Sequence, residues 1–334
     1  MNSNFTSEVS VAYLFERFKF FLDKDVNEYS FGNSKTYLAR YSLDYQFSKN
    51  TRVNTLLEYN DIRGEGSSMQ SRNYTVFSST ALLQHRFTKN VKIGANIRKE
   101  WNNVFNTPVV FGVNSDIDVS KTYTITVKGS RDFRVPTFND LYWQPGGNLD
   151  LVPEVSYQLD LGQQFTFKRL TAKAHVFVID IEDMIQWRPN DSGIWSPINI
   201  NEVQSKGVEL GLEYTHKNVS LNGNYSYTDS RDKTTDAQLI FVPFHKFTGA
   251  LAYSYKNLSA YYQQLFNGEV YAIGRILDAY TVANIGVNYT LKTKTLGRYT
   301  TGVKINNLFN TYYENVAVRP MPNRNFNLNL TYNF

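Results

Sequence analysis

The sequence of 334 residues contains no cysteine. This excludes disulfides, thiol catalysis and metal sites held by cysteine. Glycine (19 residues) and proline (9 residues) are scarcer than in average proteins, which argues against a collagen-like, low-complexity or disordered chain. The 35 Lys and Arg residues barely exceed the 30 Asp and Glu residues, and no nucleic-acid-binding module accompanies this net charge of +5.

Long hydrophobic runs are also missing. The mean hydropathy is −0.41, and no segment approaches the roughly 18 apolar residues of a membrane-spanning helix. This low hydropathy does not exclude a transmembrane β-barrel, because the strands of such a barrel are apolar on one face only. Residues 1–10 lack the basic and apolar regions of a signal peptide. If the protein is exported, we expect its native N-terminus to lie elsewhere.

Alternation of apolar and polar residues is the dominant pattern. It runs through residues 37–47, 208–214 and 283–291, and no convincing helix of ten residues is seen. This period of two predicts β-strands with one apolar face. At the C-terminus, the apolar positions are Phe326, Leu328, Leu330, Tyr332 and Phe334.

Two kinds of connection separate these strands. The short turns carry lysine and are expected at 49–50, 89–90, 120–121, 168–169, 217–218, 256–257 and 292–295. The longer polar segments are expected at 24–34, 61–72, 101–107, 131–152, 187–198, 229–242, 268–278 and 308–321. The layout predicts about sixteen strands, the first near Phe18 to Asn27, and several of them are long enough to cross a membrane. We therefore predict an all-β fold, a transmembrane antiparallel β-barrel, over a propeller or a soluble sandwich.

Three motifs, in order, carry a family resemblance. The segment from Arg131 to Trp143 and the following Gly147–Glu154 resemble the FRAP and GNPDLKPE boxes of TonB-dependent outer-membrane receptors. Downstream, the segment Ser205–Leu210 resembles their G-x-E strand start. The chain end, with its NLF segment at 307–309 and Pro320–Arg324, resembles their closing motif. Leu149 and Asn323 stand where the family usually has Pro and Gly.

The resemblance implies a plug domain and barrel strands that these 334 residues do not contain. Family members combine a plug domain with a 22-stranded barrel, and seven predicted strands precede the FRAP-like box here while nine follow it. This count makes the chain similar to strands 7–22. We therefore expect residues 1–334 to be a single partial β-barrel domain, without the plug and first strands. The terminal alternation also resembles the signal for barrel assembly in the outer membrane, which would be carried by Phe326, Leu328, Leu330, Tyr332 and Phe334.

The long loops are the candidate ligand-binding region. The motif residues of the first such loop are Phe133, Arg134, Pro136, Asn139, Tyr142, Asn148, Asp150, Pro153 and Glu154. For Arg134 the alternative is structural, a pairing with a barrel carboxylate, because a buried guanidinium needs a partner. Exposed aromatic and arginine side chains suit a large, polar, planar ligand; each of them could equally pack loops or sit at the membrane interface. These candidates are Trp143, Trp187, Arg188, Trp195, Phe241, Tyr271, Arg275, Tyr312, Tyr313 and Arg319.

Catalytic and metal signatures are absent from the sequence. The four histidines are scattered, without metal-binding spacing, and no G-x-S-x-G motif occurs. We therefore expect no enzymatic activity and no cofactor.

The resemblance implies an outer-membrane receptor of a Gram-negative bacterium, with periplasmic short turns and extracellular long loops. Its ligand would be a large, scarce nutrient. A cobalamin-type corrinoid is expected first, because Phe138–Trp143 and the ending after Arg319 look most like cobalamin-receptor relatives. A ferric siderophore follows, and haem comes last because 137–146 contain no histidine.

The resemblance implies as partners outer-membrane lipid, the missing plug and strands, and the TonB complex through that plug. A surface lipoprotein is a further candidate partner, and no nucleic acid is expected. The alternatives are a plugless, porin-like passive channel and a soluble β-rich adhesion or scaffold protein.

Overall fold

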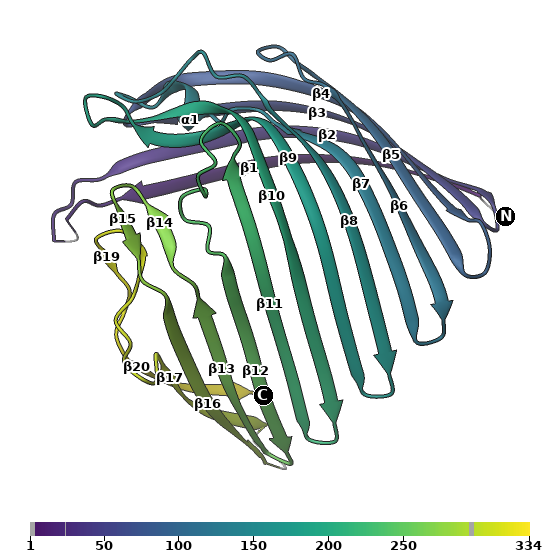
Figure 1. Ribbon diagram of the computed structural model, residues 1–334, viewed down its shortest axis with the longest axis vertical. Helices are drawn as coiled ribbons and strands as arrows, with labels where there is room; N and C mark the ends of the chain where they lie inside the picture. Colours follow the sequence, from purple (N-terminus) through teal and green to yellow (C-terminus); the bar gives the residue numbers. More distant parts are fainter. Residues whose placement is uncertain (1–3, 24, 294–296) are drawn as a thin grey trace. The chain divides into compact units, whose positions relative to one another are not determined.

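The computed structural model describes residues 4–23, 25–293 and 297–334, and most of these residues lie in β-strands (Figure 1). Sixteen strands form one sheet, in the order β1 to β13, then β16, β17 and β20. They are β1 (Phe5–Phe20), β2 (Ser30–Ser48), β3 (Thr51–Gly66), β4 (Met69–Arg86), β5 (Val91–Asn102), β6 (Val109–Ser120), β7 (Tyr123–Arg134), β8 (Glu154–Phe167), β9 (Leu170–Pro189), β10 (Trp195–His216), β11 (Val219–Asp232), β12 (His245–Tyr255), β13 (Leu258–Asn267), β16 (Tyr280–Lys292), β17 (Arg298–Asn306) and β20 (Asn325–Asn333). The predicted number of strands is confirmed, with seven before the FRAP-like box and nine after it.

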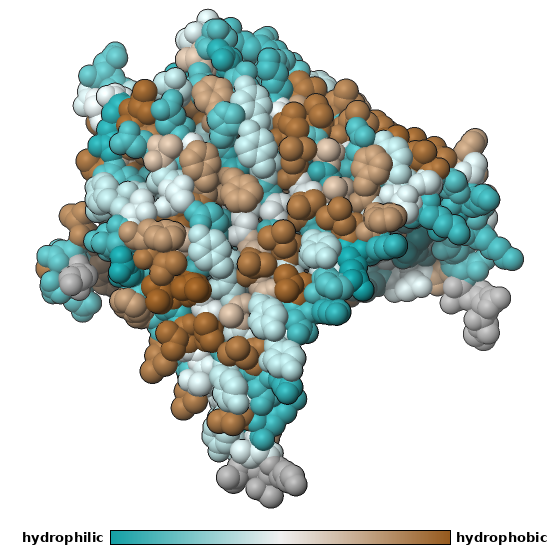
Figure 2. Space-filling model, turned by 60° about the horizontal axis from the view of Figure 1, so that its bottom comes forward, coloured by the Kyte–Doolittle hydropathy of each residue, from teal (hydrophilic) through white to brown (hydrophobic). Residues whose placement is uncertain are grey.

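The predicted alternation of faces is confirmed by the pairing of strands. In β11 and β12, Tyr225 lies opposite Phe247 and Leu221 opposite Leu251 on one face. Leu221, Phe247 and Leu251 stay exposed, and in β20 Leu328 is 80% exposed. Hydrophobic residues form brown patches over the face seen in Figure 2, with hydrophilic residues at its upper and side margins. One face is therefore suited to a hydrocarbon environment rather than to water.

The lysine-bearing turns link successive strands closely. Lys168, Lys217 and Lys256 each begin such a turn with a positive φ, between 49° and 53°. This left-handed conformation lets the chain reverse within two residues. Six of the seven predicted turns are confirmed, and the seventh, at 292–295, extends beyond the described residues.

Two predicted boundaries are wrong. The first strand is not Phe18 to Asn27, because β1 pairs with β2 from Phe5 opposite Tyr45 to Phe20 opposite Ser30. The segment 61–72 is not a long loop, since only residues 67 and 68 separate β3 from β4. Its polar residues are strand residues that pair on both sides, which polar composition alone does not reveal.

Short elements occupy three of the predicted long connections. The helix α1 (Phe138–Tyr142) follows β7. The hairpin β14 (Val270–Ala272) and β15 (Arg275–Leu277) precedes β16, and the hairpin β18 (Glu314–Val316) and β19 (Arg319–Pro320) precedes β20. Within the described residues, no helix is long and apolar enough to cross a membrane.

The chain divides into two compact units. The first comprises Met1–Ile117, Thr126–Leu159 and Ile179–Gln204, and the second comprises Asp118–Ile125, Asp160–Val178 and Ser205–Phe334. The first unit contains a buried hydrophobic cluster of Leu141, Leu151 and Ile185, against which Phe105 and Tyr142 pack. This cluster anchors the long loop that carries the two motif boxes.

Candidate functional site

The loop between β7 and β8 starts with a capped helix. Thr137 is the N-cap of α1, and its hydroxyl accepts a hydrogen bond from the Asp140 amide at 3.2 Å. In return, the Asp140 carboxylate accepts from the Thr137 amide at 2.9 Å. This reciprocal capping box explains why so short a helix forms here, directly after the buried Pro136.

Asp140 also joins the loop to β9. Its carboxylate, only 8% exposed, accepts a hydrogen bond from the indole nitrogen of Trp187 at 2.8 Å. The Arg134 guanidinium lies 3.8 Å from the same carboxylate. One buried carboxylate therefore contacts both the motif residue Arg134 and the candidate ligand residue Trp187, and the indole N–H of Trp187 is already used in a structural hydrogen bond.

Arg134 is paired with a carboxylate, as the structural alternative expected. It donates two hydrogen bonds to Glu154, at 2.7 and 2.9 Å, and the bond to Glu154 raises the pKa of Arg134. Glu154 also accepts from the backbone amide of Ile185 at 2.9 Å. This bidentate pair closes the base of the loop, because Arg134 ends β7 and Glu154 begins β8.

The second motif box is bound to the start of β10. Asn148 donates to the carbonyl of Pro197 at 3.0 Å, and its side-chain oxygen accepts from the Asp150 amide. The Asn199 side chain bonds both the amide and the carbonyl of Val152, as a paired strand would. Asn199 was missed by sequence reasoning, because a single asparagine between apolar residues carries no distinct signal.

The loop then folds over the ends of β3 and β4, beside which α1 lies in Figure 1. The Phe138 ring stands over Gly64, where an added Cβ would come within 2.7 Å of it, and packs against Tyr74 at 5.0 Å. The Gln144 amide donates to the Ser68 carbonyl at 2.8 Å. Glycine at position 64 therefore permits the close approach of an aromatic ring to the strand.

A pocket of about 860 Å³ opens beside this loop within the first unit. Its aromatic lining comes from Phe18, Phe138 and Trp143. Three hydrogen-bonded polar residues also line it: Arg17 donates to Asn33 at 2.7 Å, and Asn33 donates to Glu65 at 3.0 Å. Aromatic faces next to charged groups are suited to a large ligand with both flat and polar parts.

The predicted ligand residues fall into two groups. In the first unit, Trp143 meets Trp187 edge to face at 5.6 Å, Arg188 donates to Gln186, and Trp195 begins β10. Among the motif residues, Asn139 lines the same pocket as Trp143, while Tyr142 lies under the Arg72 guanidinium. Phe133 is the residue of β7 before the last one, Arg134, and Pro153 directly precedes Glu154, the first residue of β8.

The second unit holds the other group, which gathers around Glu314. Its carboxylate accepts hydrogen bonds from Arg275 and, at 2.8 Å, from the Tyr312 hydroxyl. Nearby, Tyr313 packs against Tyr280 at 4.6 Å, and the Phe241 amide donates to the Tyr271 carbonyl. Arg319 lies on β19. Glu314 was missed by the sequence analysis, because its partner Arg275 is 39 residues away.

The contacts of Glu314 are expected to weaken on acidification. The hydrogen bond from Tyr312, followed by the charge of Arg275, holds the pKa of Glu314 below its usual range. Because the pKa is lower in the folded state, ionised Glu314 stabilises its contacts at any pH above the pKa of the unfolded state. This stabilisation is lost as the pH falls through the pKa of the folded state. We expect the Val318 amide, which donates to Glu314 at 3.2 Å, to lose hydrogen-exchange protection in that acid range. Glu314→Gln should abolish this pH dependence; unchanged dependence would contradict the assignment.

No metal-binding arrangement is evident in the described part of the chain: no three His, Asp or Glu residues there are placed to hold an ion.

Comparisons with known proteins identify relatives over most of the chain. It is 28% identical over 263 residues to the vitamin B12 transporter BtuB of Vibrio vulnificus (strain YJ016), covering 76% of this chain and 42% of that protein. It is 27% identical over 256 residues to the BtuB of Photobacterium profundum, covering 75% and 41%. The chain therefore spans less than half the length of these curated relatives.

Solved structures share the fold. The siderophore receptor PirA of Acinetobacter baumannii superposes with a TM-score of 0.82, at 15% identity, over 99% of this chain and 60% of that one. At this identity, the likeness concerns the fold alone.

A family match covers nearly the whole sequence. Residues 2–308 match the family described as TonB dependent receptor-like, beta-barrel. Its members are outer-membrane receptors and transporters rather than enzymes, which confirms the predicted fold class and the expectation of a non-enzymatic chain. The chain belongs to the TonB-dependent receptor β-barrel family.

Proposed function

We propose that this chain forms the barrel portion of a receptor that takes up a large, scarce nutrient across the outer membrane, with a cobalamin-type corrinoid as the first ligand. The main support is that the curated relatives in two organisms are vitamin B12 transporters. The pocket lined by Phe18, Phe138 and Trp143 adds a site whose aromatic and charged side chains suit a ligand with flat and polar parts. A ferric siderophore is the second candidate, since a siderophore receptor shares the fold; haem is third.

The proposal includes parts that residues 1–334 do not contain. The relatives are more than twice as long as the segment they share with this chain. We propose that a plug domain and further strands complete the receptor, and that the TonB complex acts through the plug. A surface lipoprotein is a possible further partner. The alternative is a porin-like passive channel, which would need no plug.

Ligand binding and uptake are separable tests. We would express the chain in a Gram-negative strain that lacks its cobalamin receptor, and measure binding of labelled cyanocobalamin and of a ferric siderophore to its outer membranes. We expect cyanocobalamin to bind and growth on limiting cobalamin to stay independent of TonB, because energised uptake resides in the plug. The Trp143→Ala variant should weaken binding, whereas Tyr255→Ala, at the end of β12 and outside the pocket lining, should not.

Three results would contradict parts of this proposal. Siderophore binding without cyanocobalamin binding would reject the corrinoid. Passage of small solutes with no binding of either ligand would favour the passive channel. Growth that depends on TonB would show that the chain suffices for import.

The orientation of the loops gives a separate prediction. We expect the long loops to face outward and the lysine turns to face the periplasm, as in outer-membrane barrels. A cysteine at Ser192, in the connection from β9 to β10, should react with an impermeant reagent on intact cells. A cysteine at Asn257, in a lysine turn, should react only after the outer membrane is permeabilised. The reverse pattern would invert the topology.

A further inference from the structure

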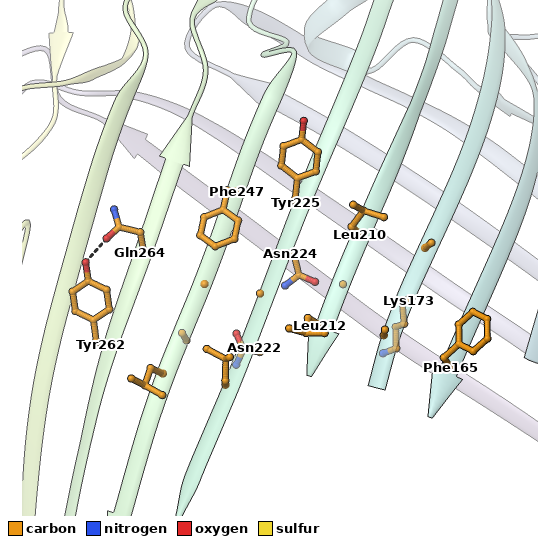
Figure 3. Close-up of a pocket in the computed structure, with 18 residues that line it drawn as sticks. Phe165, Lys173, Leu210, Leu212, Asn222, Asn224, Tyr225, Phe247, Tyr262 and Gln264 are labelled. Carbon is orange, nitrogen blue, oxygen red and sulfur yellow. Dashed lines mark hydrogen bonds between the residues drawn. The ribbon is translucent and has the colours of Figure 1, made fainter. Parts of the chain in front are cut away.

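A hollow interrupts the apolar face of the sheet in the second unit, where it is formed by β8 to β13 (Figure 3). Its floor includes a pair of glycines, because Gly223 of β11 lies directly opposite Gly249 of β12. Two residues away on either side, the same face carries the larger pairs Tyr225 with Phe247 and Leu221 with Leu251. The missing side chains leave a volume of about 690 Å³.

The hollow is open because small residues occupy it. A Cβ added to Gly223 would meet nothing closer than the Phe247 ring at 3.8 Å, an ordinary contact. Ala172 and Ala174 of β9 add further short side chains. The walls are hydrocarbon and remain exposed, with Leu210 at 46% and Phe165 at 51%. Among the described residues of the second unit, none fills the space over Gly223, where a side chain would fit, whereas the Phe247 ring lies over Gly249, 3.0 Å from an added Cβ.

Two polar side chains of β13, Tyr262 and Gln264, line the hollow. Gln264 lies opposite Gly249, and Tyr262 lies opposite Leu251, so both share the apolar face. The Tyr262 hydroxyl donates to the side-chain oxygen of Gln264, the dashed line in Figure 3. Among the described residues, no acceptor is found for the Gln264 amide nitrogen. An amide N–H without an acceptor is costly in hydrocarbon, so this group calls for an acceptor from outside the chain.

We propose that this hollow binds one acyl chain of an outer-membrane lipid, and that the carbonyl at the head of that chain accepts a hydrogen bond from Gln264. A lipid is the expected occupant because the hollow is part of the apolar strand face, and in a barrel of this family that face contacts membrane lipid. Hydrocarbon walls fit the methylene groups of the chain, and the linkage carbonyl supplies the acceptor that Gln264 lacks. This lipid site is independent of the nutrient ligand proposed above.

The test uses the full chain in vesicles that contain a phospholipid with a photoreactive acyl chain. After illumination, mass spectrometry maps the lipid adducts along the sequence. We expect adducts to concentrate on residues around the hollow, such as Phe247 and Leu251, above those on apolar positions elsewhere, such as Val127. The Gly223→Leu variant should lower the adducts at the hollow by about fivefold, the equivalent of losing one or two buried methylene contacts.

Gly129→Leu is the matched control. Gly129 also lies in a strand, β7, with nothing closer to an added Cβ than 3.8 Å, but it is outside the hollow. The Gly129→Leu variant should leave the adducts at Phe247 unchanged. The Gln264→Leu variant removes the amide while the glycine floor stays open, and like Gly223→Leu it should lower the adducts at the hollow. Retained heat-modifiability on gels shows that each variant is folded; if Gly223→Leu fails to fold, the wild-type map and Gln264→Leu decide the question.

Two outcomes would overturn the inference. Adducts spread evenly over the apolar face, with Gly223→Leu equal to Gly129→Leu, would mean that lipid contacts the hollow no differently from any other position. Concentration-dependent dimers that shield Phe247 from the lipid probe would assign the hollow to a second copy of the chain.

Discussion

Replacing Asp140 with alanine is expected to release the loop between β7 and β8. The carboxylate accepts hydrogen bonds from the Thr137 amide, the Thr137 hydroxyl and the Trp187 indole, at 2.8 to 2.9 Å. Without it, these donors are left unpaired and Arg134 loses a nearby charge. We expect the free energy of local opening to fall by roughly 3 kcal/mol. Hydrogen exchange of residues 137–153 measures this directly.

Two variants make this result specific. Asp140→Asn retains one acceptor oxygen and should lose less protection than the alanine variant. Asp150→Ala changes an exposed carboxylate in the same loop and should have little effect. Equal exchange in Asp140→Ala and Asp150→Ala would show that the buried carboxylate does not hold the loop.

Replacing Leu210 with arginine is expected to destabilise the chain in a membrane by about 2–4 kcal/mol, the cost of a cation on the lipid-facing surface near mid-depth. Leu210 is 46% exposed on the apolar face of β10. Its neighbour Glu209 lies on the opposite face, so Glu209→Gln should cost much less. The free energy of unfolding from lipid vesicles is the measurement. A similar loss in the two variants would contradict the assignment of faces.

Local patterns explain why much of the fold could be predicted. The alternation in residues 208–214 and 326–334 is decided within each strand, because successive side chains point to opposite faces. The lysine turns at 168, 217 and 256 are equally local, because each reverses the chain within two neighbouring residues. The FRAP-like box likewise indicated the family from contiguous residues. These features need no knowledge of which strands become neighbours.

Pairing over long distances accounts for what could not be predicted. Residues 61–66 look like a polar loop, yet they are strand because β2 and β4 bind them on both sides. Trp187 resembled a free ligand contact, but the carboxylate that engages its indole lies 47 residues away. The two glycines of the hollow are unremarkable in sequence, and only the register places Gly223 opposite Gly249.

The sequence by itself determined most of the strands, their two faces, the turns and the family, because each of these follows from short-range periodicity or a contiguous motif. The tertiary structure alone decided the register, the buried carboxylate at Asp140, the contacts of Glu314 and the hollow beside Gln264. The physical reason is that folding joins residues tens of positions apart, and within the sheet a register shift of one residue would move the side chains of a strand to the other face.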